Sequence, residues 1–281
     1  MKTTRNRTTV VMMTTAAVLF AAAQAPAGLI GHWRFDEGSG TTAVDSSANG
    51  NDATQSIAAG GWIAGKAGGA YNLPRFWTPA DPPGLQPPTG PVSVSAWVKP
   101  NAAQANWTCL AGFEGTGTGY DVYSLKVSSD ASAGGQDHLQ FLIPGGPTNC
   151  GSTDTLMNYS AATADGWVHV VGVFDPNVSL SLYVNDSLDK SVPTTLASLS
   201  QKSGARFNMG RYTNTTSYTY NGAIDDVQVY DQALSADDVT FLYNNPGSTL
   251  GDDVIPEPAT LALLSLAACG LGGYVRRRRK A

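Results

Sequence analysis

Polar and apolar residues alternate along much of the middle of the chain, and a period of two is the pattern of half-buried β-strands. In residues 92–98, three valines and one alanine alternate with two serines and Trp97, and residues 178–184 alternate Val and Leu with Ser and Tyr. Gly, Pro, Asn and Asp gather between such segments and indicate turns and loops. The pattern predicts strands at residues 29–35, 92–98, 108–113, 123–127, 139–143, 167–174, 178–184, 206–210 and 223–230.

The last of these strands carries two adjacent acids. Strict alternation places Asp225 on the same face as Val227 and Val229, and Asp226 on the opposite face. Burying an unpaired charge costs far more free energy than apolar packing beside it returns. We therefore expect Asp225 to be exposed, neutralised, or held by hydrogen-bond donors or a metal ion.

A short helix is expected directly after this strand. Ser235 is placed to cap it, with Asp238 at the third helical position as a variant of the capping box. Leu234 and Val239 stand where a hydrophobic staple requires apolar residues. The helix is expected to end at residues 244–246, which read Asn-Asn-Pro.

Many short strands, one closing helix and no alternation of strands with helices predict an all-β fold. The arrangement is expected to be a two-sheet antiparallel sandwich rather than a barrel. A chain of 281 residues that is 42% hydrophobic can bury one sizeable core, and 31 glycines with only 14% charged residues suit sheets and turns. We expect one domain at residues 28–245, followed by a linker at residues 246–254.

The formal net charge of −5 conceals a strongly acidic body, because eight of the 17 basic residues lie at the two ends of the chain. The remaining nine face 22 acidic residues, so the body carries about −13. Phosphate recognition needs clustered cations on the domain itself. The sequence therefore argues against a nucleic-acid partner.

Residues 1–27 begin with basic residues, continue with an apolar run and end in small residues, which is the order of a secretory signal peptide. Export leads to an oxidising compartment, so Cys109 and Cys150, the two cysteines outside the C-terminal tail, are expected to form a disulfide bond. The sequence gives no distance between them, and two free thiols remain the alternative.

The C-terminal tail combines three features in a fixed order. Pro256, Glu257 and Pro258 precede an apolar segment at residues 259–275, and a basic cluster follows it. At ~1.5 Å per residue, the apolar segment spans about 25 Å as a single helix, slightly less than a hydrocarbon core of ~30 Å. An ordinary tail anchor is one interpretation, with the basic cluster on the cytoplasmic side.

This tail also resembles the PEP-CTERM sorting signal of bacterial envelope proteins, here at residues 255–281. The resemblance implies an exosortase as a partner, which would cleave near the Pro-Glu-Pro triplet after a transient membrane anchorage through the apolar helix. It further implies export to the cell envelope, the cell surface or the extracellular matrix.

The body resembles the laminin-G-like, or concanavalin A-like, jelly-roll domain of bacterial surface proteins. The resemblance rests on segments that occur in the family's order: GHWRFDEGSG, WIAGKAGGA, VSVSAWVKP, WVHVVGVFD and GAIDDVQVYDQALSADDV. It implies a jelly roll whose first and last strands pair. Domains of this family often bind glycans.

An enzymatic activity is not expected. Glucanases of this fold carry a Glu-x-Asp-x-x-Glu run on one strand, and no glutamate in this chain has another near it in sequence. The three histidines are too scattered to suggest a zinc site, and His169 is expected to be a packed core residue. A glycoside hydrolase remains the weakest of the functional interpretations.

Calcium is the metal that the sequence suggests, because Ca²⁺ takes ~6–8 oxygen ligands. If the first and last strands pair, the loop after Phe35 brings Asp36, Asn51 or Asp52 close to Asp225. In the alternative interpretation, Asp225 accepts backbone N–H bonds and organises the loop without a metal ion.

Aromatic side chains suggest where a ligand would bind. Trp97, Tyr212, Tyr218 and Tyr220 are candidates for a surface on which sugar rings stack, although Trp97 also fits a second packing layer. The functional expectation is an exported, non-catalytic module that binds extracellular polysaccharide or a surface protein. A purely structural or adhesive matrix protein without a specific ligand is the alternative.

Overall fold

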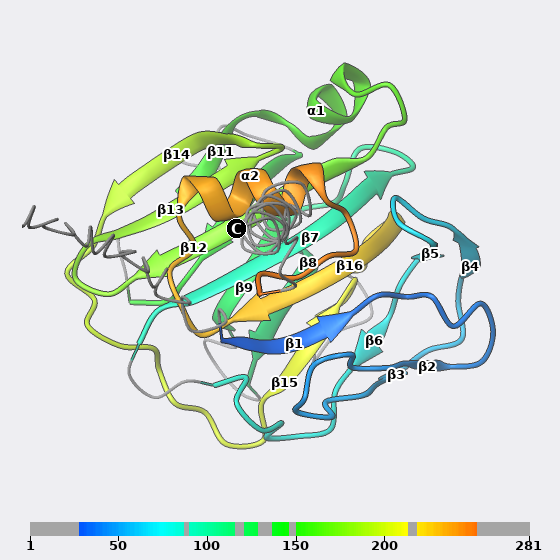
Figure 1. The fold of residues 1–281 in the computed structure, drawn as a ribbon, viewed down its shortest axis with the longest axis horizontal. Coiled ribbons are helices and arrows are strands. Elements are labelled where there is room, and N and C mark those ends of the chain that lie inside the picture. The colour runs from blue at the N-terminus through cyan, green and yellow to red at the C-terminus, as the bar shows by residue number, and fades with distance from the viewer. Residues whose placement is uncertain are drawn as a thin grey trace, which may run out of the picture.

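Two antiparallel β-sheets packed face to face form the body of the protein (Figure 1). The computed structural model describes residues 28–86, 90–115, 121–128, 137–145, 150–212 and 218–251. The all-β, two-sheet sandwich predicted from the alternating pattern is confirmed. The predicted signal peptide and the apolar segment at residues 259–275 lie outside the described residues.

The sheet that contains both the opening strand and the closing strand is called sheet A. Every pairing within it is antiparallel. In spatial order its strands are β14 (Ser187–Pro193), β13 (Ser179–Val184), β12 (Val168–Asp175), β7 (Val92–Pro100), β16 (Gly222–Tyr230), β5 (Gly69–Asn72) and β4 (Gly61–Ala64), and β1 (Leu29–Trp33) also pairs with β16.

The second sheet is called sheet B, and it is also antiparallel throughout. In spatial order its strands are β11 (Cys150–Thr155), β10 (His138–Leu142), β9 (Asp121–Ser128), β8 (Thr108–Glu114), β15 (Arg206–Met209), β6 (Phe76–Trp77), β3 (Ala53–Gln55) and β2 (Thr42–Ala43). The face of each sheet that points away from the other sheet is called its outer face.

The main core lies between the two sheets. Along β7, the valines and the alanine of residues 92–98 point into this core, while the serines and Trp97 point to the outer face of sheet A, as the alternation predicts. Trp33 of β1 stacks on Phe207 of β15 with ring centroids 4.8 Å apart, which joins the two sheets. An offset aromatic pair of this kind contributes about 0.5–1.5 kcal/mol beyond its buried area.

The closing strand β16 contains a bulge at its two acids. Its register with β7 shifts between Asp225 and Gln228, and Asp226 has a φ of 47°, in the left-handed region. An extra residue in one strand resets the alternation of its side chains. Val227 and Val229 consequently point into the core, while Asp225 is buried on the outer face beside the turn that joins β4 to β5. The prediction that Asp225 shares a face with the two valines is therefore wrong.

Helix α2 (Ala236–Asn244) covers part of the outer face of sheet A (Figure 1). The predicted capping box is present, since Ser235 Oγ accepts a bond from Asp238 N at 3.2 Å and Asp238 Oδ2 accepts one from Ser235 N at 2.8 Å. Val239 is buried in a small cluster with Tyr230 of β16, so the helix is held by both its cap and its apolar face. A second helix, α1 (Leu156–Ala162), follows β11 and was not predicted.

The two cysteines of the body are both free and buried. Cys109 lies on β8 and Cys150 on β11, and β9 and β10 separate these strands. Strands spaced ~4.8 Å apart place the two residues about 14 Å from each other, while a disulfide bond needs Cα atoms ~4.4–6.8 Å apart. The predicted disulfide bond is therefore wrong, because the order of strands in the sheet keeps the thiols apart.

The first part of the predicted linker lies against sheet A. Gly247 N donates to Asp226 Oδ2 at 2.7 Å, Ser248 O accepts from Gln228 Nε2 at 3.0 Å, and Leu250 N donates to the Tyr230 hydroxyl at 3.3 Å. These bonds hold residues 247–250 over the closing strand. In the described part of the chain, no helix has the length and apolar character needed to cross a membrane.

Two glycines in sheet A test how tightly the sheets pack. A Cβ added to Gly172 of β12 would lie 2.2 Å from the ring of Phe141 in sheet B, whereas one added to Gly61 of the edge strand β4 would meet nothing within 4 Å. We expect Gly172→Ala to lower the free energy of unfolding by about 1–3 kcal/mol, because overpacking forces the sheets apart. We expect Gly61→Ala to change it by less than about 0.5 kcal/mol. Urea unfolding measures both, and equal effects would contradict the packing described.

Candidate functional site

The outer face of sheet A is filled by the protein's own side chains. Trp97 is 1% exposed and stacks on His169 and on Tyr243 of α2, with ring centroids 4.9 and 5.5 Å away. Lys66 Nζ lies 4.6 Å from the centre of the Trp97 ring. The expectation that Trp97 belongs to an exposed ligand surface is therefore wrong, and the packing alternative describes it.

His169 is buried in the same layer, as the sequence predicts. Its Nε2 is 2.8 Å from Ser95 Oγ, and burial lowers the pKa of His169 to about 4. The imidazole is consequently neutral at physiological pH. Because a catalytic Ser–His pair also needs access to substrate, this buried pair serves packing rather than nucleophilic chemistry.

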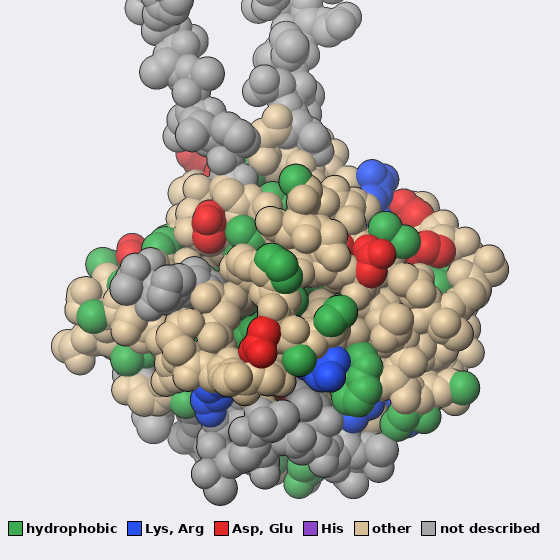
Figure 2. Space-filling view, turned by 90° about the horizontal axis from the view of Figure 1, so that it is seen from below, with side chains coloured by type: hydrophobic (Ala, Val, Ile, Leu, Met, Phe, Trp, Pro, Cys, Tyr) green, Lys and Arg blue, Asp and Glu red, His purple; other side chains and the backbone are tan. Residues whose placement is uncertain are grey.

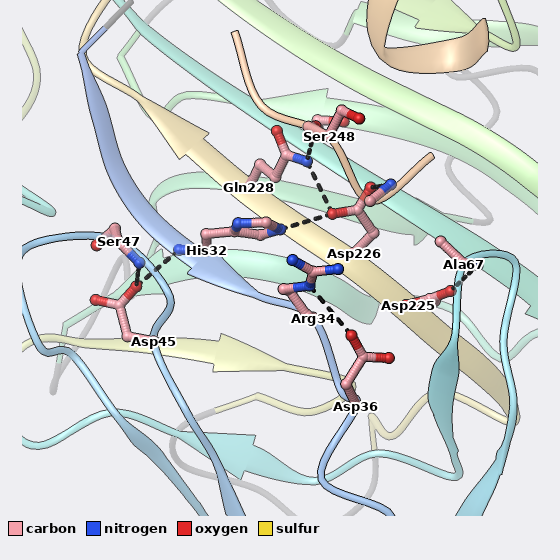
Figure 3. A network of polar contacts seen from close by, with 12 residues as sticks. His32, Arg34, Asp36, Asp45, Ser47, Ala67, Asp225, Asp226, Gln228 and Ser248 are labelled. Atoms are coloured by element: carbon pink, nitrogen blue, oxygen red, sulfur yellow. Dashed lines mark hydrogen bonds and ion pairs between the residues drawn. The ribbon is translucent and has the colours of Figure 1, made fainter. Parts of the chain in front are cut away.

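Asp226 joins three segments that are far apart in the sequence (Figure 3). His32 Nε2 of β1 lies 2.7 Å from Asp226 Oδ1, Gln228 Nε2 donates to the same oxygen at 2.8 Å, and Gly247 N donates to Asp226 Oδ2. Burial acts to raise the pKa of Asp226, but the bonds and charge of His32 and the bond from Gln228 hold it below its usual value. Sequence reasoning missed this role, because β1 and residue 247 are brought to Asp226 only by the fold.

Asp225 is held by a different segment. Its Oδ2 accepts a bond from Ala67 N at 2.9 Å, while its Oδ1 is buried and, among the described residues, has no hydrogen-bond partner. Burial raises the pKa of Asp225 to about 7, the charge of Asp226 adds to this shift, and the Ala67 N–H opposes it. A carboxyl group in this position is partly protonated at neutral pH.

The four predicted calcium ligands fall into two groups. Asp36 accepts a bond from Gly69 N at 2.6 Å, so Asp36 and Asp225 both contact the turn at residues 65–69. Asn51 and Asp52 instead contact Asp45, since Asn51 N donates to Asp45 Oδ2 at 2.7 Å and Asp45 N donates to Asp52 Oδ1 at 2.9 Å. Within the described residues, no three His, Cys, Asp or Glu side chains form a group able to hold a metal ion. Calcium stays a prediction.

The outer face of sheet B has a different character. Its cross-strand register aligns four polar residues, one glycine and one tryptophan in a row that crosses six strands. In spatial order the row contains Thr42, Thr54, Trp77, Asn208, Gly112 and Ser124. Trp77 is half-buried, so part of this row reaches the surface. The sequence gives little sign of the row, because its members come from segments up to 166 positions apart.

A second row on the same face contains Lys126 and Gln140, which pair across β9 and β10. Lys126 is fully buried, and its Nζ lies 2.8 Å from Asp121 Oδ1 and also contacts the Tyr212 hydroxyl. Gln140 is fully buried too, and in the part of the chain that the structure describes neither its Oε1 nor its Nε2 has a hydrogen-bond partner.

Two of the four predicted aromatic ligand residues lie together beside these rows. The rings of Tyr212 and Tyr218 are 6.0 Å apart, and Tyr218 is 39% exposed while Tyr212 is buried. Tyr220 is in the main core and is buried, so its predicted place on a ligand surface is wrong. Of the four aromatics, Tyr218 alone is exposed.

Sequence reasoning also missed a pair of carboxylates on this face. Glu114 of β8 pairs with Asp121 of β9, and both are buried. Asp121 Oδ1 accepts bonds from Lys126 Nζ and Ser124 Oγ, each at 2.8 Å, and Glu114 Oε2 accepts one from Asn208 Nδ2 at 3.3 Å. The available sequence signal was the two consecutive predicted strands at residues 108–113 and 123–127, because facing positions of paired antiparallel strands bring side chains together.

The pKa of Asp225 gives a stability test with a defined sign. Between an unfolded pKa of about 3.9 and the folded value of about 7, the native state keeps a proton that the unfolded state has lost. Stability therefore falls as the pH rises through this window, by at most a few kcal/mol. We expect Asp225→Asn to remove this fall and to raise the melting temperature at pH 8 relative to the wild type.

Asp226→Asn is the matched control, because the pKa of Asp226 is shifted down and its charge favours the fold. We expect it to lower the melting temperature at pH 8 through loss of the charge-assisted bond to His32. A wild-type protein whose stability does not fall between pH 4 and 7 would contradict the assignment for Asp225.

Calcium binding has a separate test. A rise in the melting temperature on adding calcium, absent in Asp225→Asn, would support the calcium prediction, and no rise would argue against it.

Comparison with known families identifies two parts of the chain. The concanavalin A-like lectin/glucanases superfamily matches residues 78–240, which is more than half of the chain. The PEP-CTERM protein-sorting motif matches residues 254–280. Both agree with the resemblances read from the sequence.

Solved structures share the fold at low sequence identity. Domain 4 of AbnA, an extracellular GH43 arabinanase from Geobacillus stearothermophilus solved with arabinotriose, is 21% identical with a TM-score of 0.54, covering 78% of this chain and 100% of that domain. The binding domain of Paraclostridial Mosquitocidal Protein 1 is 12% identical with a TM-score of 0.57, covering 77% of this chain and 52% of the other.

Botulinum neurotoxin type C, whose cell entry depends on interaction with two ganglioside molecules, is 13% identical with a TM-score of 0.56, covering 77% of this chain and 51% of the other. The chain thus spans about half the length of the two toxin structures, and the likeness shows the fold alone. No curated protein sequence matches the chain. The family match and the two-sheet sandwich together show that the chain belongs to the concanavalin A-like lectin/glucanases superfamily and carries a PEP-CTERM sorting motif.

Proposed function

We propose that the protein is an exported, non-catalytic binding module that holds a saccharide on the outer face of sheet B. The contrast between the two outer faces carries this proposal. On sheet A, α2 and residues 247–250 already occupy positions over the strands. On sheet B, polar residues of the row through Asn208 lie near the exposed ring of Tyr218, and polar groups with an aromatic ring are the composition that saccharide sites use.

Gln140 supports a polar ligand on this face. A buried polar group without a hydrogen bond costs about 1–3 kcal/mol, so buried amides are nearly always paired. The Gln140 side chain is fully buried beside Lys126 and has no partner for either polar atom among the described residues. A sugar hydroxyl both donates and accepts, so it could pair with both atoms of this amide once binding uncovers them.

Tyr218 is the aromatic side chain best exposed for a sugar ring. Its edge-to-face contact with Tyr212 fixes the ring, and Tyr212 is in turn fixed by Lys126 and by Asp121. Tyrosine is a frequent contact residue because it offers a large rigid surface at low cost in conformational entropy. The carbohydrate-bound arabinanase domain and the ganglioside-dependent toxin share this fold, which is consistent with a saccharide ligand.

The C-terminal motif supports the proposed destination of the protein. A PEP-CTERM motif indicates export and sorting to the cell envelope, and recognition by an exosortase-type enzyme. We propose that Pro256, Glu257 and Pro258 form the recognised triplet and that the apolar segment anchors the chain in the membrane before processing. The domain would then act at the cell surface or in the extracellular matrix.

Hydrolysis is the second candidate function, because Glu114 and Asp121 face each other on adjacent strands. Glycosidases use two carboxylates, one of which must hold or take up a proton. Asp121 is instead saturated by donors from Lys126, Ser124 and Tyr212, as expected of a structural ion pair. Turnover of any bound glycan that is abolished by Glu114→Gln would contradict the non-catalytic proposal.

A glycan array followed by calorimetry on the best ligand tests the proposal. We expect Tyr218→Ala to weaken binding by roughly tenfold, because truncation of an aromatic contact residue typically costs more than 1 kcal/mol. Tyr183→Ala, at a half-buried position on the outer face of sheet A, is the matched control and should leave the affinity unchanged. Absence of binding to every glycan, with and without calcium, would contradict the proposal and favour a structural or adhesive role.

A further inference from the structure

Three arginines gather around Trp77 on the outer face of sheet B, in a body that carries only nine basic residues against 22 acidic ones. Of the six other basic residues of the body, Arg34, Lys66 and Lys126 each form an ion pair with an aspartate. The three arginines are Arg75, Arg206 and Arg211, and together with Trp77 they are called the arginine patch. Clustered charges of one sign create a local potential that attracts ligands of the opposite sign.

The tryptophan ring orients two of the three guanidinium groups. Arg206 Cζ lies 5.0 Å and Arg211 Cζ 4.5 Å from the centre of the Trp77 ring. Arg206 Nη1 also donates to Thr78 O at 2.9 Å, and Arg211 Nε donates to Tyr212 O at 2.9 Å. Arg211 Nη1 contacts Ser56 Oγ as well. Stacking and backbone bonds therefore hold both side chains in place before any ligand binds.

Arg75 adds a third positive charge to the patch. It precedes Trp77 by two positions and shares its outward direction, while Phe76 between them points into the core. Arg75 Nε is buried and has no hydrogen-bond partner among the described residues. Neither Arg75 nor Arg206 forms an ion pair with any carboxylate in the described part of the chain.

The charges of the patch are only partly balanced. The pKa of Arg211 is lowered by burial and by the charge of Arg75, while the charge of Glu114 opposes this shift. Glu114 accepts a bond from Asn208, which pairs with Trp77 in the polar row. The neighbouring carboxylate of Asp121 is paired with Lys126, so Glu114 faces three guanidinium groups and the site is net positive.

We propose that the arginine patch binds carboxylate groups of an acidic polysaccharide, of the uronate class. This inference rests on the proposed saccharide-binding function and names the class of saccharide. A guanidinium group binds a carboxylate through two parallel hydrogen bonds, so preoriented arginines suit a uronate better than a neutral sugar. Because two guanidinium groups lie over the Trp77 ring, the ring serves to orient them rather than to stack a sugar.

The net charge of the body narrows the class of anion. Duplex DNA carries one charge per ~1.7 Å, and about −13 on the body opposes so dense a polyanion. A uronate polysaccharide carries at most one carboxylate per sugar, which a single local patch can neutralise. In Figure 2, most of the basic side chains lie in the lower part of the view beside hydrophobic ones, and most of the acidic side chains lie in the upper part.

Matched ligands test the inference. The probes are uronate-containing oligosaccharides and the same oligosaccharides after chemical reduction of their carboxyl groups, each measured by calorimetry with the full domain. We expect at least tenfold tighter binding of the acidic form, with an affinity that decreases as salt is raised from about 0.05 to 0.5 M because exposed charge pairs are screened. Arg206→Gln should abolish most of this difference, and Arg75→Gln should reduce it.

Arg34→Gln is the control variant, because Arg34 is already paired with Asp36 and directly follows β1 of sheet A, away from the arginine patch on sheet B. It should leave the preference for the acidic form intact. Equal binding of the acidic and reduced forms, or a preference that survives Arg206→Gln, would contradict the proposal that the arginine patch binds carboxylate groups. The proposed saccharide-binding function would remain. Failure of every saccharide to bind would overturn both.

Discussion

The bulge in the closing strand β16 is the constraint on which the arrangement of sheet A depends. One extra residue at Asp225 and Asp226 turns both carboxylates to the outer face while Val227 and Val229 continue into the core. On one side β16 pairs with β7, and on the other it pairs first with β5 and then with β1. The bulge lies where β5 ends and β1 begins, so each acid reaches a different neighbour.

These two acids close the domain by different means. Asp226 is ionised and receives bonds from β1, from its own strand and from the chain that leads toward the sorting motif. Asp225 contacts the turn at residues 65–69 through a single backbone bond and keeps one buried oxygen without a described partner. The pair therefore combines a well-compensated charge with a poorly compensated one, and both lie on the face of sheet A over which α2 and residues 247–250 are placed.

Local features of this fold could be predicted from the sequence, and features that depend on strand order could not. The cap of α2 and the alternation of β7 need only neighbouring residues, so both predictions are confirmed. The disulfide bond between Cys109 and Cys150 required a strand order that the sequence does not contain. The face of Asp225 was predicted wrongly because a bulge changes the alternation without changing the composition.

The position of the candidate site could not be predicted from the sequence. Aromatic side chains drew attention to Trp97 and to residues 212–220, yet Trp97 and Tyr220 are packing residues. The rows on sheet B, the pair of Glu114 and Asp121 and the arginine patch all join residues from different strands, which only the cross-strand register brings together. Sequence periodicity reports which face a residue occupies, but it does not report its neighbours on that face.

The central claim is that a saccharide binds to the outer face of sheet B. The most direct measurement is an NMR titration of the isotopically labelled domain with an oligosaccharide that binds it. The account predicts that the perturbed amides cluster on β6, β8, β9 and β15, with those of α2 and of the turn at residues 65–69 unchanged. Perturbations confined to α2 or to that turn would contradict the account, because they would place the ligand on sheet A.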